Sequence, residues 1–235
     1  SGYMFKALFG DPKTTGATAN KTHVFTVKDN QPSIIVEKAF PDLNKYVRYK
    51  GVKINTFSVD FGQDNEMTFK FNVMGASREQ DSTAYDSSAK ASKLLRIAQN
   101  HAYVKIDGTE SRIVKEGSLE INANLDGDQY VVGGGGLRGD IPEGLMKVSG
   151  SLKALFTSTE WMDKADTGAA VAMEIGFKLD ENTSLIFAMP TVQFEPFDTQ
   201  ISGPAGVVVD VKWRAFSADG KSIVTTTLKN QQETY

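Results

Sequence analysis

The sequence contains no cysteine among its 235 residues. This absence excludes disulfide bonds, zinc sites built from thiolates and a cysteine nucleophile. No stretch approaches the ~18 consecutive apolar residues that a membrane-spanning helix needs, so we expect no membrane span. The first residues lack a basic segment followed by a long apolar run, and we therefore expect no signal peptide.

Neither sign of charge is in large excess. Lysine and arginine number 26 against 29 acidic residues, which gives a formal net charge of −3. A chain without a basic excess has no field that attracts nucleic acid by counterion release. A weakly acidic surface instead allows a polyanion such as DNA to pass without adsorbing. We therefore predict that any DNA this protein meets is not bound tightly.

Groups suited to metal binding or acid–base catalysis are scarce. The two histidines, His23 and His101, are far apart in the sequence and have no partner at metal-ligand spacing. We expect neither to hold a metal or to act as a general base. Acidic clusters at residues 60–66 and 126–128 could attract calcium, but neither completes a calcium-binding loop. Both are typical of turns instead.

One glycine motif resembles a cofactor-binding fingerprint. Gly134, Gly136 and Gly139 match the spacing G-x-G-x-x-G, but that mechanism also needs a helix directly afterwards. Pro142 and Gly144 disfavour such a helix, so we predict a flexible hairpin tip. The sequence contains neither a G-x-S-x-G nor an H-E-x-x-H motif. A pair of facing carboxylates stays open as an alternative, but we predict no enzyme, no catalytic residue and no cofactor.

The sequence is rich in alternating apolar and polar residues, above all over residues 117–216. Ser118-Leu-Glu-Ile-Asn-Ala and Val209-Asp-Val-Lys-Trp-Arg are two examples, and this pattern is typical of half-buried strands. A short helix is predicted near residues 160–165. The dipeptide Asp219-Gly220 supplies the positive φ of a tight turn, which predicts a hairpin between the two strands on either side of it.

The N-terminal half repeats the strand pattern with interruptions. Strands are predicted at residues 52–61 and 67–73, and a phase change near Asn55 and Thr56 predicts a β-bulge. We predict one domain, 1–235, of the all-β class: a mainly antiparallel β-sandwich or barrel with one short flanking helix. Its irregular parts are a flexible loop or arm at 11–20, a loop-plus-helix insertion at 76–100 with its helix at 89–99, and a tail at 230–235.

Several segments, in this order, resemble the major tail tube proteins of long-tailed bacteriophages. The likeness covers residues 46–230. Its carriers are Tyr49-Lys-Gly-Val-Lys-Ile-Asn-Thr-Phe-Ser-Val59, Met67-Thr-Phe-Lys-Phe-Asn-Val-Met-Gly75, Gly117-Ser-Leu-Glu-Ile-Asn-Ala-Asn-Leu125, Val148-Ser-Gly-Ser-Leu-Lys-Ala-Leu-Phe156 and Gly203-Pro-Ala-Gly-Val-Val-Val-Asp-Val-Lys-Trp-Arg-Ala-Phe216.

The resemblance implies a homo-oligomer whose hexameric rings stack into a tube. Double-stranded DNA would pass through this tube without specific binding, on its way into the host. The partners implied are other tail proteins: the tape measure, the tail terminator, and the distal tail or baseplate. The location implied is the virion, with assembly in the host cytoplasm.

Flexible segments of such a protein are candidates for contacts between subunits and between rings, because they can become ordered on assembly. The candidate contact residues are Asp11, Thr15, Asp42, Asn44, Gly133, Gly136, Arg138, Asp140 and Tyr235.

Two other functions share the strand pattern. A carbohydrate- or host-binding β-sandwich of a virion or pilus would have an exposed aromatic or calcium patch and would bind glycans. The tube-forming component of a bacterial secretion system also stacks rings, and the sequence does not separate it from a phage protein.

Overall fold

The computed structural model describes residues 2–17, 20–62, 67–91, 98–199 and 206–235. This part of the chain contains fourteen strands, two α-helices and two 3-10 turns. The elements are α1 (Gly2–Phe9), β1 (Lys13–Thr15), β2 (Lys21–Thr26), β3 (Ile34–Phe40), η1 (Pro41–Leu43), β4 (Lys45–Phe61), β5 (Phe69–Met74), β6 (Ser77–Asp81), η2 (Gln99–His101), β7 (Ala102–Ile106), β8 (Thr109–Glu110), β9 (Val114–Asn122), β10 (Lys147–Leu155), α2 (Glu160–Thr167), β11 (Val171–Asp180), β12 (Thr183–Phe194), β13 (Val208–Ala215) and β14 (Thr225–Asn230).

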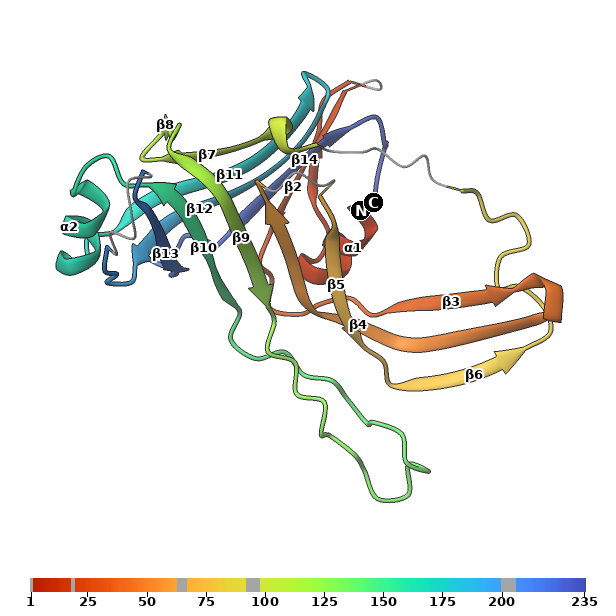
Figure 1. The fold of residues 1–235 in the computed structure, drawn as a ribbon. Coiled ribbons are helices and arrows are strands. Elements are labelled where there is room, and N and C mark those ends of the chain that lie inside the picture. Colours follow the sequence, from red (N-terminus) through yellow and green to blue (C-terminus); the bar gives the residue numbers. More distant parts are fainter. Residues whose placement is uncertain (1, 18–19, 63–66, 92–97, 200–205) are drawn as a thin grey trace.

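The strands form one antiparallel sheet that folds back on itself into two layers (Figure 1). One layer contains β7, β11, β12, β14 and β2, and the other contains β13, β10, β9, β4 and β5. β12 connects the layers because its first half pairs with β14, whereas its residues 192–194 pair with β13. The all-β prediction is confirmed. The helix predicted near residues 160–165 is α2, which ends at Gly168 with a φ of 65°.

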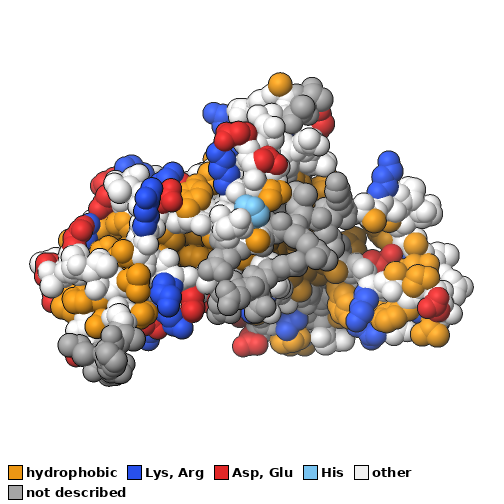
Figure 2. Space-filling view, turned by 45° about the horizontal axis from the view of Figure 1, so that its top comes forward, with side chains coloured by type: hydrophobic (Ala, Val, Ile, Leu, Met, Phe, Trp, Pro, Cys, Tyr) orange, Lys and Arg blue, Asp and Glu red, His pale blue; other side chains and the backbone are white. Residues whose placement is uncertain are grey.

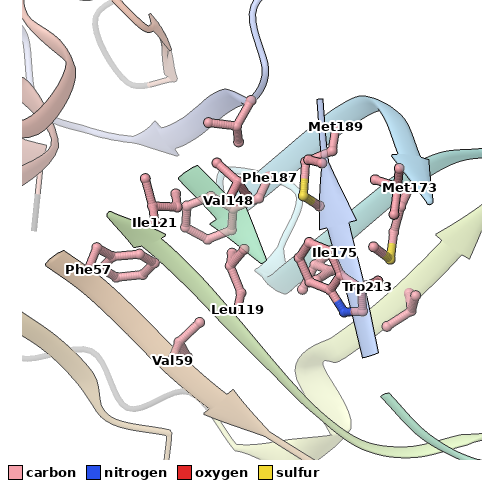
Figure 3. Close-up of a cluster of buried hydrophobic side chains, with 14 of the residues drawn as sticks. Phe57, Val59, Leu119, Ile121, Val148, Met173, Ile175, Phe187, Met189 and Trp213 are labelled. Carbon is pink, nitrogen blue, oxygen red and sulfur yellow. The ribbon is translucent and has the colours of Figure 1, made fainter. Parts of the chain in front are cut away.

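Apolar side chains of the two layers meet between them (Figure 3). Phe57 and Leu119 come from one layer, and Ile175 and Phe187 come from the other; all four are fully buried. Because side chains alternate along a strand, each strand contributes one face to this core. The alternation seen in the sequence is therefore the alternation between core and surface.

Helix α1 closes the space between the layers. Its Phe5 ring lies 5.3 Å from the ring of Phe57, 5.9 Å from that of Phe187 and 6.1 Å from that of Phe25. These partners come from both layers, so α1 is part of the core. The helix was not predicted, because eight residues are too few for a helical period to stand out.

β4 is the longest described strand, with 17 residues, and it belongs to two groups of strands. Its second half pairs with β5 and β9 in the sandwich. Its first half pairs with β3 and β6 in a three-stranded extension, here called the arm (Figure 1). Gly51 lies at the junction with a φ of 61°, a conformation that favours glycine. The predicted bulge is confirmed by a register shift between Ile54 and Thr56.

The irregular segments differ in part from the expectations. The segment 11–20, expected to be a flexible loop, contains β1, which pairs with β2. The insertion at 76–100 begins with β6, which pairs with β4 in the arm. Both strands are short and polar, so they lack the apolar alternation that would reveal them. The helix predicted over 89–99 falls mainly on residues 92–97, which lie outside the described residues.

The predicted C-terminal hairpin is wrong in its pairing. Asp219 and Gly220 do have positive φ values of 53° and 69°, as the tight turn requires. However, β13 pairs with β10 and β12, whereas β14 pairs with β12 and β2. The two strands bind successive parts of one edge of β12 and then diverge into different layers. Turn chemistry is local, but the choice of strand partners is not.

Candidate functional site

The arm is held together by an ion-pair node around Arg48 of β4. Its guanidinium donates from Nε to Glu37 Oε2 at 2.7 Å and from Nη1 to Asp81 Oδ2 at 2.7 Å. Nη2 donates to the carbonyl of Thr83, and the Tyr85 ring lies 5.5 Å from Arg48 Cζ. The node therefore joins all three strands of the arm to the segment that follows β6.

Electrostatics favour the charged forms of Arg48 and Asp81 in this node. The hydrogen bond to Glu37 raises the pKa of Arg48, which ensures that the guanidinium stays charged. The pKa of Asp81 is lowered, chiefly by hydrogen bonds from the backbone and hydroxyl of Thr83 and also by Arg48. The Arg48 side chain is 11% exposed. Guanidinium and carboxylate pair in a fixed geometry, so the node gives the arm a defined shape.

The tip of the arm carries two of the predicted contact residues. Asp42 lies in the first turn of η1, and Asn44 follows it with a left-handed φ of 49°. The Asn44 N–H donates to the Pro41 carbonyl at 3.0 Å, which closes the turn. Beside them Leu43 is 70% exposed. Figure 2 shows hydrophobic side chains gathered over the arm, at the right of the view. The arm thus presents apolar surface to a partner.

The loop between β9 and β10 carries four more of the predicted contact residues. A bridge between Tyr130 and Arg138 makes it a hairpin, as expected from the lack of a helix after the glycines. Gly133 and Gly136 lie at its tip with positive φ, next to the fully exposed Val132. The Arg138 side chain forms hydrogen bonds to backbone carbonyls of its own chain.

The loop contacts the sandwich through apolar and polar groups. Leu125 and Ile141 are buried in the core. Arg138 donates to the carbonyl of Gly75, just after β5, at 2.8 Å and to the carbonyl of Gly127 in the loop itself at 2.5 Å. Asp140 caps its own chain by accepting the Ile141 N–H. At the base of the loop, Lys53 of β4 and Glu143 form an ion pair of 2.8 Å.

Of the remaining contact residues, Asp11 and Tyr235 lie near α1. Asp11 forms an ion pair of 2.8 Å with Lys6 of that helix, and this contact lowers the pKa of Asp11. The same Lys6 ammonium donates to the carbonyl of Tyr235 at 2.9 Å. Thr15 belongs to β1, where it pairs with Thr22. Eight of the nine residues therefore lie at the arm tip, in the β9–β10 loop or beside α1, and Thr15 lies apart from them in β1.

A fourth surface was not predicted from the sequence. It is the outward side of β5, β4, β9, β10 and β13, here called the polar face. Leu119 and Ile121 of β9 point into the core, so Ser118 and Glu120, which alternate with them, point outward. The same alternation places Ser149 and Ser151 of β10 beside them, in register with the outward residues of β9. The face consists mainly of small hydroxyl side chains and charged residues, with the apolar pair Leu155 and Val208 at one end.

Groups that could hold a metal ion do not converge in the described parts of the chain. Among those residues no group of three or more His, Asp or Glu side chains could hold a metal ion. His23 is buried, where its ring nitrogens contact Thr14 Oγ1 and the Gln232 carbonyl. His101 Nδ1 accepts the Ala98 N–H. No described helix is both long and apolar enough to cross a membrane.

Sequence reasoning missed the arm, its Arg48 node and the polar face. The arm had one sequence signal, the unusual length of the strand pattern that begins at residue 45. The node had none, because Glu37, Arg48 and Asp81 are brought together by strand pairing alone.

A family model described as phage tail tube protein matches residues 1–215, which is most of the chain. No curated protein matches the sequence at a significant level. The matched region contains both layers of the sandwich except β14, and it contains the whole arm.

Proposed function

The chain belongs to the phage tail tube protein family, and we propose that its copies associate edge to edge into hexameric rings that stack into the tail tube. The family is one of structural virion proteins, so the product of the fold is shape rather than catalysis. The tube delivers DNA into the host and grows in the host cytoplasm. The tape measure, tail terminator and distal tail or baseplate proteins are its partners.

The observation that carries this proposal is the free edge of β5. Within the described residues β5 pairs with β4 and with no other strand. A free edge presents a row of unpaired N–H and C=O groups that can pair with another chain. Repeated heterologous pairing that closes by rotation produces a ring, and a ring leaves no edge of this layer unpaired. The polar face would then become part of a continuous inner wall.

A second set of contacts is needed to stack the rings. The arm tip and the β9–β10 loop both extend beyond the sandwich (Figure 1). Leu43 on the first and Val132 on the second are large apolar side chains in solvent. The free energy falls when a neighbouring ring covers exposed apolar groups and removes them from water. We assign the predicted contact residues Asp42, Asn44, Gly133 and Gly136 to this axial contact. Arg138 and Asp140, whose side chains form hydrogen bonds within the subunit, would support it by holding the loop in place.

Electron microscopy tests the proposal. Purified protein, concentrated and left to assemble, is expected to form hollow tubes of uniform width. The variant Asn72→Lys adds a second lysine to β5 beside Lys70, and charge on an edge strand blocks pairing. It should fold but form no tubes. Asp166→Lys on α2 is the matched control and should assemble like the wild type. Equal assembly of both variants would refute pairing through the β5 edge.

A further inference from the structure

The charges on the polar face are balanced. Five outward side chains on or beside these strands are cationic: Lys70, Lys147, Lys153, Lys212 and Arg214. Five are anionic: Asp60, Glu116, Glu120, Glu195 and Asp210. These ten charges sum to zero. Lys115, which is exposed at the register shift of β9, is not counted among them.

The balance is local, because opposite charges lie on neighbouring strands. Lys153 of β10 is in register with Glu116 on one side and with Asp210 on the other. Its Nζ forms an ion pair of 3.1 Å with Glu116. Cross-strand pairs of opposite charge stabilise a sheet, whereas like charges directly opposite destabilise it.

Two more ion pairs extend this pattern to both sides of the face. Lys70 of β5 lies 3.5 Å from Asp60 of β4. Arg214 of β13 donates from Nε to Glu195 at 2.6 Å, just after the end of β12. Ion pairing therefore occurs on β5, on β10 and on β13, over the full width of the layer. Between these pairs Ser58, Ser118 and Ser151 provide neutral hydroxyl groups.

This pattern has a consequence for a polyanion beside the face. An unpaired lysine binds a DNA phosphate, and the counterions condensed on the DNA are released. A tube contains many copies of each lysine, which would multiply that attraction. A face of carboxylates alone would repel DNA, but it would also make neighbouring subunits repel one another. On this face three of the five cations, Lys70, Lys153 and Arg214, already have a carboxylate partner. The charges of the other two, Lys147 and Lys212, are offset by Glu120 and Asp210 in the sum. A face of this kind has neither problem.

We propose that the polar face is the surface that passing double-stranded DNA meets, and that its carboxylates serve to keep the lysines and Arg214 from binding phosphate. This inference rests on the proposed function, which places the face toward the lumen. The recognised partner is the DNA backbone, and the interaction is tuned to be weak. Glu116 is the central residue, since it neutralises Lys153.

The test converts four of the carboxylates to amides: E116Q/E120Q/E195Q/D210N. The face then carries a charge of +4, from five cations and the one remaining carboxylate. The matched control E110Q/D166N/E181Q/D219N changes the net charge of the chain equally, but at exposed positions outside the face. Binding of a fluorescent DNA duplex to the subunits is measured by anisotropy over a series of salt concentrations.

We expect the face variant to bind the duplex at least about tenfold more tightly than the control at low salt, with an affinity that falls steeply as salt rises. The wild type should bind negligibly. Equal binding by the face variant and the control would overturn the proposal, because net charge alone would then explain the effect. The single variant E116Q frees Lys153 with little risk to folding and should give the same trend with a smaller salt slope.

A second measurement determines whether the polar face points into the lumen of the tube. Tubes are assembled in the presence of the duplex and then treated with nuclease. Duplex held by face-variant tubes should be protected, whereas digestion would put the face on the outside and overturn the proposal. Failure of the wild type to form any tube would instead refute the proposed function, and the comparison between subunits would still decide the charge argument.

Discussion

The sandwich and the arm are built from the same long strand but are stabilised in different ways. In the sandwich, β4 contributes Phe57 and Val59 to a core of buried apolar side chains. In the arm, the same strand contributes Arg48, which is held by Glu37 and Asp81. The sandwich thus buries its core of apolar side chains, whereas the arm largely buries the ion pair of Arg48 with Glu37 and exposes Leu43.

This difference separates folding from assembly. Burial of apolar surface is the main source of stability, so the sandwich can fold as a monomer. The arm has too few buried apolar groups for that, and ion pairs define its shape instead. Its apolar groups stay available for another subunit. We expect a subunit of this kind to fold before it meets its neighbours and to gain further stability from contact with them.

The largest effect on stability is expected in the core. Phe5→Ala removes the ring that joins α1 to both layers, and it should lower the free energy of unfolding by about 3–5 kcal/mol. Urea denaturation followed by circular dichroism measures this loss. Val132→Ala, at a fully exposed position, is the control and should change it by less than about 0.5 kcal/mol. Equal effects would show that α1 is not part of the core.

The next effect is confined to the arm. Arg48→Met keeps the length of the side chain but leaves Glu37 and Asp81 without their shared cation, so the arm should loosen. Hydrogen exchange should become faster in β3 and β6 and stay unchanged in β9 and β10. Arg78→Met on the exposed side of β6 is the control. Uniformly faster exchange over both regions would contradict the separation of arm and sandwich.

Deletion of residues 133–136 should affect assembly alone. The loop tip is exposed and makes the predicted axial contact, so the variant should unfold like the wild type but form no tubes. Denaturation and electron microscopy of the same sample measure the two properties. Normal tubes from this variant would exclude the loop from the contact between rings.

The smallest effect is a pH dependence of the arm. The pKa of Asp81 is lower in the folded protein than its ordinary value of 3.8. Its carboxylate therefore stabilises the arm above that value, and the contribution is lost as the pH falls below it. Exchange in β6 should accelerate only below pH values of about 4. In Asp81→Asn this acid-induced change should be reduced, and an unchanged pH profile would exclude Asp81 as its origin.

Much of the sandwich could be predicted from the sequence. The alternation around Leu119 and Ile121 identified their burial, and the phase change at Asn55 identified the bulge. Each of these features depends on a few consecutive residues. The candidate site was less predictable. The candidate contact residues were chosen by local composition, but Asp11 and Tyr235 both contact Lys6 because separate parts of the chain meet at α1.

The sequence by itself determined which side chains are apolar and with what period, and therefore the class of the fold and the membership of its core. It also excluded disulfides and thiolate metal sites. The tertiary structure decided which strands are neighbours: that β13 and β14 separate, that β4 leaves the sandwich at Gly51, and that Lys153 lies between Glu116 and Asp210. The physical reason is the sequence separation over which each feature is determined. Periodicity follows from the geometry of a single strand, whereas pairing depends on residues that are far apart in the chain.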